Sequence, residues 1–124
     1  MAKTPLISVV DDDKSVRESL SGLIRAVGFA VAEFASAEAF LRSGRLDETD
    51  CLILDVRMPG MNGLELQHHL SCNRIEIPII FITAHTGDED VRSRALDAGA
   101  AAYLSKPLSE ESVLEAVHAV LHTN

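Results

Sequence analysis

Acidic side chains gather at the ends of two apolar segments. Asp11, Asp12 and Asp13 follow one such segment, and Asp55 ends another. Carboxylates that share a small space repel one another, and a bound divalent cation relieves that repulsion. A site made of oxygen ligands suits magnesium better than zinc. If the fold brings these aspartates together, they therefore predict a Mg²⁺ site.

A hydroxyl and an amine stand at two further segment ends. Thr83 follows the apolar stretch "IPIIFI", and Lys106 follows "AAYLS". A carboxylate, a cation, a hydroxyl and a lysine together provide what is needed to hold a phosphoryl group. The carboxylate of Asp55 can itself be the acceptor, forming an acyl phosphate by nucleophilic attack.

These residues are positioned by a strict alternation of strand-like and helix-like segments. Strands are expected at 6–10, 29–34, 51–54, 77–82 and 101–104, and amphipathic helices at 15–27, 36–43, 63–71, 88–98 and 109–121. Such alternation indicates an α/β fold, a single doubly wound (βα)5 flavodoxin-like domain with a five-stranded parallel sheet in the order 2-1-3-4-5. In that order the reactive residues all follow adjacent strands, and ligands bind at the carboxyl ends of such strands.

Local capping and turn signals refine this prediction. Ser15 and Glu18 have the spacing of a capping box at the start of the first helix. Asp13 is expected to cap that helix or to be solvated. Gly60 and Gly63 are expected to adopt turn conformations with positive φ.

The bulk properties exclude several classes of protein. The 124 residues suggest one domain, 1–124, with a core over about 6–121. The net charge of -8 argues against direct binding of nucleic acid. No segment predicts a membrane span or a secretory signal, so a cytoplasmic protein is expected. Cys51 and Cys72 are expected to be buried or half-buried thiols, and the four histidines on helices to be exposed.

Four motifs in order carry a resemblance to a known family. The stretches "VVDDDKSVRESL", "LILDVRMPGMNGLEL", "PIIFITAH" and "AAYLSKP" resemble the receiver domain of bacterial two-component response regulators. The phrases "VRESL", "SAEAFL" and "RMPGMNGLEL" are most similar to the nitrogen-fixation type of transcriptional regulator. The resemblance covers about residues 6–121, and no output domain follows, so a stand-alone regulator and a piece of a longer one both remain open.

The resemblance implies a role for each matching residue. Asp55 matches the phosphorylated aspartate. Asp12, assisted by Asp11 directly or through water, matches the magnesium-binding acidic pair, and the backbone carbonyl of Arg57 matches the third protein ligand. Lys106 matches the lysine that pairs with the phosphoryl group, and the bond before Pro107 is expected to be cis.

The same resemblance implies a switch and partners. Thr83 matches the hydroxyl residue that moves to the phosphoryl group, and Tyr103 the aromatic residue that turns inward. Arg57 and His85 occupy positions that tune the removal of the phosphoryl group by water. The implied phosphodonor is a phosphohistidine on a sensor histidine kinase, and a homodimer through the helix 4–strand 5–helix 5 face is possible. The stretch "HTGDEDV" is about one residue longer than usual, which leaves the start of the fourth helix open.

Two alternatives belong to other classes. One is a small aspartate-nucleophile phosphatase, with Asp11 as the nucleophile and Asp13 as the acid, although no later acidic pair or cap domain supports it. The other is a binding module without chemistry, which the intact set of reactive residues disfavours.

Overall fold

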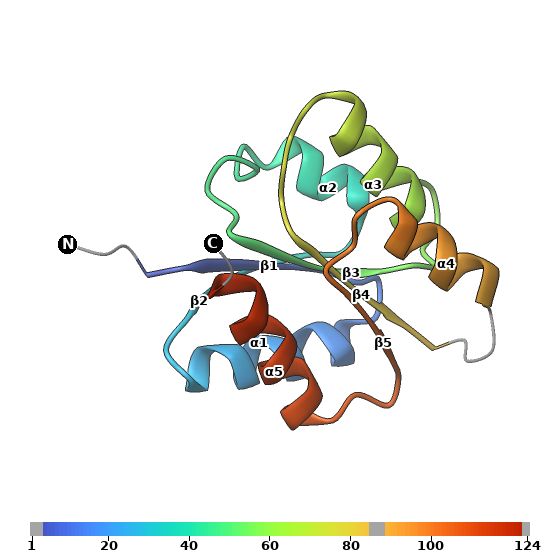
Figure 1. Ribbon diagram of the computed structural model, residues 1–124. Coiled ribbons are helices and arrows are strands. Elements are labelled where there is room, and N and C mark those ends of the chain that lie inside the picture. The colour runs from blue at the N-terminus through green and yellow to red at the C-terminus, as the bar shows by residue number, and fades with distance from the viewer. Residues whose placement is uncertain (1–3, 85–88, 123–124) are drawn as a thin grey trace.

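Five parallel strands form one sheet in the computed structural model, which describes residues 4–84 and 89–122 (Figure 1). The strand order is β2-β1-β3-β4-β5, as the sequence predicted. Their bounds are β1 Leu6–Val10, β2 Ala30–Phe34, β3 Cys51–Asp55, β4 Ile79–Thr83 and β5 Ala102–Ser105. All residues of β3 and β4 are buried because each lies inside the sheet with helices on both faces, whereas the edge strand β2 is partly exposed.

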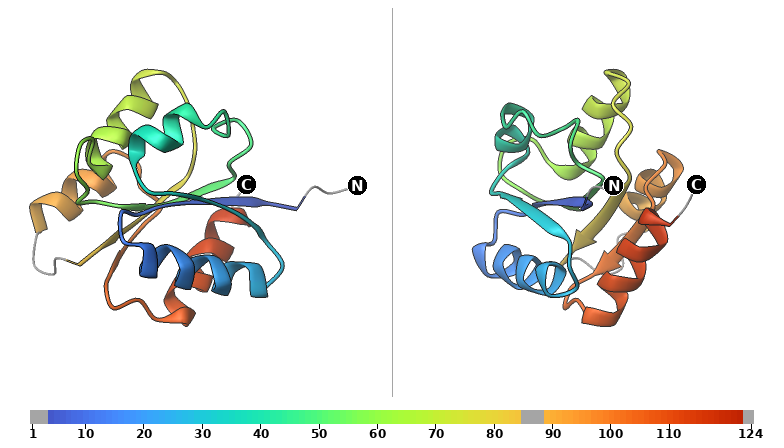
Figure 2. Two further views of the ribbon diagram at one scale, coloured as in Figure 1. Left: turned by 180° about the vertical axis from the view of Figure 1, so that it is seen from behind. Right: turned by 90° about the vertical axis from the view of Figure 1, so that its left-hand side faces the viewer.

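The helices form a layer on each face of the sheet (Figures 1 and 2). Their bounds are α1 Lys14–Ala26, α2 Ala37–Arg42, α3 Gly63–Cys72, α4 Glu89–Asp97 and α5 Glu110–Leu121. Helices α1 and α5 pack against one face, while α2, α3 and α4 pack against the other, so the apolar core has two halves. No helix in the described ranges is long and apolar enough to cross a membrane.

The first helix begins earlier than its capping signal suggested. Asp13 is the N-cap, and its carboxylate accepts hydrogen bonds from the backbone N–H groups of Ser15 (2.9 Å) and Val16 (3.4 Å). The prediction of a Ser15–Glu18 capping box was therefore wrong, because the aspartate two residues upstream provides the acceptor. Glu18 instead forms an exposed ion pair with Lys14 at 3.7 Å. The expectation that Asp13 caps the helix is confirmed.

The two cysteines lie in different environments. Cys51 is fully buried in β3, and this burial, together with the nearby charge of Asp50, raises the pKa of its thiol to about 12. Cys72 is exposed at the end of α3, so the expectation of a buried or half-buried thiol was wrong for that residue. The histidines of α3 and α5, and the one just after α5, are exposed as expected.

Two buried serines provide a matched stability test. The hydroxyl of Ser21 is buried without a hydrogen-bond partner among the described residues, whereas Ser8 Oγ lies 2.7 Å from Thr49 Oγ1. We expect Ser21→Ala to raise the free energy of unfolding by about 0.5–1 kcal/mol, because it removes an unpaired polar group and improves helix propensity. We expect Ser8→Ala to lower it by about 1 kcal/mol. Urea denaturation of both variants measures this, and a loss of stability in Ser21→Ala would show that its hydroxyl contributes a favourable contact.

Candidate functional site

Three carboxylates meet at the carboxyl edge of the sheet. Strands β1 and β3 are neighbours, with Val10 opposite Leu54, so the residues that follow or end these strands lie side by side. One carboxylate oxygen each from Asp11, Asp12 and Asp55 lies within 4.8 Å of the other two. Asp11 and Asp55 are buried, whereas Asp12 is exposed. The structure thus brings together the acidic residues that the sequence singled out.

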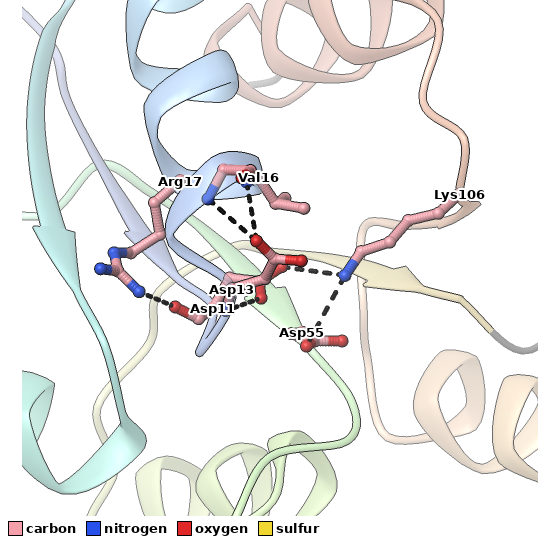
Figure 3. A network of polar contacts seen from close by, with 7 residues as sticks. Asp11, Asp13, Val16, Arg17, Asp55 and Lys106 are labelled. Atoms are coloured by element: carbon pink, nitrogen blue, oxygen red, sulfur yellow. Dashed lines mark hydrogen bonds and ion pairs between the residues drawn. The ribbon is translucent and has the colours of Figure 1, made fainter.

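Lys106 reaches this acidic cluster from the other side (Figure 3). Its Nζ donates a hydrogen bond to Asp11 Oδ2 at 3.0 Å and lies 3.7 Å from Asp55 Oδ2. The residue is placed by the neighbouring strands, since its backbone N–H donates to the Thr83 carbonyl at 2.7 Å. The sequence indicated a lysine facing Asp55, but it did not indicate that Asp11 would be the nearer carboxylate. The peptide bond between Lys106 and Pro107 is cis, as expected.

Asp11 is held by contacts along the chain as well. Its Oδ1 accepts a hydrogen bond from the backbone N–H of Asp13 at 2.8 Å. The guanidinium of Arg17 donates to the Asp11 backbone carbonyl at 2.7 Å (Figure 3). Arg17 was not predicted from the sequence, because a spacing of six residues from Asp11 matches no recognisable motif. The bond from Asp13 holds one carboxylate oxygen of Asp11 while the other accepts from Lys106, and the bond from Arg17 fixes the backbone of Asp11.

The environment of Asp55 disfavours its charged form. Burial, and after it the charge of Asp11, raises the pKa of Asp55 from 3.8 to about 7, although Lys106 acts in the opposite direction. A carboxylate that must act as a nucleophile at neutral pH needs its negative form. The acidic cluster therefore lacks the positive charge that would keep Asp55 ionised at neutral pH. A bound cation would supply that charge.

Thr83 and Tyr103 lie on the same face of the sheet. Thr83 is the last residue of β4 and is buried, while Tyr103 in β5 is half-buried. Phe81 pairs with Tyr103 in the sheet register, and their ring centroids are 6.3 Å apart. Side chains alternate along a strand, so Thr83, two residues after Phe81, points to that same α3–α4 face.

A short loop links Asp55 to α3. The backbone N–H of Gly63 donates to the Val56 carbonyl at 2.8 Å, which closes the loop. Gly60 has a φ of 76°, as predicted. Gly63 does not have a positive φ, so that prediction was wrong. Its lack of a side chain serves a close approach instead, because a Cβ there would overlap the Asp55 backbone carbonyl oxygen.

Two predictions made from the sequence concern residues close to the acidic cluster, namely the tuning role of His85 and the phosphatase alternative. His85 and residues 86–88 of the longer stretch after Thr83 lie outside the described residues, whereas residues 89–91 of that stretch belong to α4. The phosphatase alternative needs the Asp13 carboxylate as a free acid, yet that carboxylate accepts two backbone hydrogen bonds at the start of α1. The structure therefore gives no support to a phosphatase that uses Asp11 and Asp13.

The donor set suits a hard cation. Within residues 4–84 and 89–122, the three aspartates form the only group of three or more His, Cys, Asp or Glu side chains with ligand atoms close enough to share an ion. Every donor in this group is a carboxylate oxygen, which favours Mg²⁺ over the thiolate- and imidazole-binding metals. The residues present thus fit a magnesium ion.

The comparisons with known proteins agree with this geometry. Residues 7–118 match the family described as "Response regulator receiver domain". The chain is 48% identical over 112 residues to nodulation protein W of Bradyrhizobium diazoefficiens, which covers 90% of this chain and 49% of that protein. It is 41% identical over 115 residues to the transcriptional regulatory protein FixJ of Azorhizobium caulinodans, covering 93% of this chain and 54% of that protein.

A solved structure shows the same likeness in three dimensions. The response regulator StyR superposes with a TM-score of 0.88 at 48% identity, over 96% of this chain and 60% of that one. The chain spans about half the length of the curated relatives it matches.

Proposed function

The chain belongs to the response regulator receiver family, and on that premise we propose that Asp55 is its phosphoacceptor. Receivers are phosphoacceptor signalling modules of two-component systems rather than classical enzymes. The observation that carries the proposal is the position of Asp55. It is buried at the end of an inner strand, with two further carboxylates and the ammonium of Lys106 around it.

The proposed reaction transfers a phosphoryl group from a phosphohistidine of a cognate sensor kinase. An oxygen of Asp55 attacks phosphorus, a P–O bond forms, and the P–N bond to the histidine breaks with its electron pair left on nitrogen. Lys106 lies close enough to Asp55 to pair with the oxygens of the transferred group. The phosphoryl group adds negative charge beside Asp11, and the ammonium between the two carboxylates offsets part of that charge.

Asp11, Asp12, Asp55 and the backbone carbonyl of Arg57 would hold the magnesium ion in this proposal. When bound, Mg²⁺ supplies positive charge that favours the ionised form of Asp55 and offsets the charge of the phosphoryl oxygens. The close approach of the three carboxylates supports the assignment of the acidic ligands. Arg57 lies two residues after Asp55, in the loop that closes onto α3.

The proposed output is a change of surface. Thr83 moves toward the phosphoryl group, and Tyr103 turns into the space that Thr83 leaves beside Phe81. This would alter the α4–β5–α5 face, which we propose as a homodimer surface.

Two residues near Asp55 in the family pattern would tune the loss of the phosphoryl group to water. They are Arg57, which is exposed in the loop after Asp55, and His85. By likeness to FixJ, the whole protein would control transcription through a part beyond this domain, without direct contact between this domain and nucleic acid.

Phosphorylation by a small donor tests the proposal directly. With acetyl phosphate and Mg²⁺, we expect the wild type to gain one phosphoryl group by intact mass spectrometry and Asp55→Asn to gain none. Asp47→Asn is the matched control, since it changes an exposed aspartate in the loop before β3. It should be labelled like the wild type. Labelling of Asp55→Asn at the wild-type level would refute Asp55 as the phosphoacceptor, and labelling of the wild type that continues when Mg²⁺ is chelated would refute the proposed role of the metal.

A further inference from the structure

A carboxylate on α2 reaches the loop that follows Asp55. Glu38 lies in the first turn of α2, and its Oε2 accepts a hydrogen bond from the backbone N–H of Met61 at 2.9 Å. The two residues are 23 positions apart in the chain. The bond therefore joins two separate elements, α2 and the β3–α3 loop, rather than stabilising one helix.

The loop is shaped to admit this carboxylate. A Cβ at Gly60 would lie 2.6 Å from Glu38 Oε2, and Gly60 has a φ of 76°, where other residues are strained. A glycine here thus meets two requirements, the turn conformation and the approach of Glu38. The hydrogen bond to the charged carboxylate lowers the pKa of Glu38, as expected for a bond that favours the ionised form.

The backbone N–H of Asn62, the residue after Met61, is bound by a carboxylate of α3. Glu65 Oε1 in α3 accepts from the N–H of Asn62 at 2.9 Å, and Asn62 Oδ1 accepts from the N–H of Glu65 at 2.9 Å, which makes a capping box. The adjacent N–H groups of Met61 and Asn62 are thus bound by carboxylates from two different helices. The capping box fixes the loop to its own helix, whereas Glu38 fixes it to α2.

We propose that Glu38 is a positioning residue for the magnesium site. In this proposal Glu38 fixes the β3–α3 loop that carries Arg57 through the Met61 amide, and so keeps the Arg57 carbonyl where it can bind a metal ion held by the three aspartates. The inference rests on the proposed function, because Arg57 is a ligand only in that proposal. Residues that orient metal ligands commonly change metal affinity about 10–100-fold when replaced.

Two substitutions separate the hydrogen bond from the charge. Glu38→Ala removes the acceptor, whereas Glu38→Gln removes the charge and keeps an oxygen that can accept from Met61. By calorimetric titration with Mg²⁺ alone, we expect Glu38→Ala to bind about tenfold more weakly than the wild type and Glu38→Gln to bind within about twofold of it. Hydrogen exchange of the Met61 amide, followed by NMR, should be about tenfold faster in Glu38→Ala and near the wild-type rate in Glu38→Gln.

The outcomes distinguish this inference from the proposed function. Wild-type Mg²⁺ affinity in Glu38→Ala would overturn the positioning role, while phosphorylation of the wild type at Asp55 would leave the proposed function standing. Equal weakening in both variants would also overturn it, since charge rather than the hydrogen bond would then matter. Failure of the wild type itself to bind Mg²⁺ would overturn the proposed function and this inference with it.

Discussion

Replacing Gly63 with alanine is expected to lower the free energy of unfolding by about 2–4 kcal/mol. Gly63 is buried at the start of α3, and the added Cβ would overlap the backbone carbonyl oxygen of Asp55. It would also lie 3.0 Å from Val56 Cα and 3.1 Å from the Phe81 ring. Backbone atoms and a packed aromatic ring cannot give way cheaply, so the strand end and the helix start must separate.

Gly22→Ala is the matched control for this substitution. Gly22 is exposed within α1, and a Cβ there would meet nothing within 4 Å. We expect it to raise the free energy of unfolding by about 0.5–1 kcal/mol, because alanine is the better helix former. Chemical denaturation of both variants checks the pair. A Gly63→Ala protein as stable as the wild type would contradict the close approach of α3 to the end of β3.

Asp55→Asn is expected to make the protein more stable at neutral and higher pH when divalent cations are chelated. The pKa of Asp55 is about 7 in the folded protein, whereas the ordinary value for an aspartate side chain, as in the unfolded chain, is 3.8. Between these values the folded state holds a proton that the unfolded chain has lost. Stability therefore falls as pH rises from about 4 to 7, and the full penalty persists above pH 7.

The asparagine variant removes this penalty. We expect it to be more stable than the wild type by about 2–4 kcal/mol near pH 8 and by much less near pH 4. Adding Mg²⁺ should stabilise the wild type more than the variant, since a ligand of the folded state stabilises it in proportion to its affinity. Urea denaturation at both pH values, with Asp47→Asn as the control, measures the difference. A gain for Asp55→Asn that is equal at pH 4 and pH 8 would contradict a raised pKa.

The architecture and the membership of the acidic cluster could be predicted from the sequence alone. Apolar runs such as 51–54 and amphipathic repeats such as 109–121 are local patterns, and their alternation restricts the topology to very few arrangements. Once the order 2-1-3-4-5 is inferred, adjacency of strands brings the residues at their ends together. For that reason Asp11, Asp55 and Lys106 were expected at one place, and the structure brings them there.

Which side chains form hydrogen bonds and ion pairs in and around the acidic cluster was decided by the tertiary structure. Lys106 lies nearer to Asp11 than to Asp55, and Arg17 supports Asp11 through a backbone carbonyl. Glu38 binds the Met61 amide across 23 residues. Such contacts depend on side-chain direction and on differences of less than an ångström between neighbouring elements, which no local pattern contains.

Gly63 shows both what the sequence predicts and what only the tertiary structure decides. Its position in "MPGMNG" indicated a turn glycine with positive φ, because turns are the commonest reason for such a residue. In the folded chain it lies instead where α3 approaches the end of β3, and only a residue without a side chain fits there. The sequence by itself determined which elements form and which residues share the edge of the sheet. The packing of helix against strand decided how closely they meet, because close packing is a property of atoms that are distant in the chain.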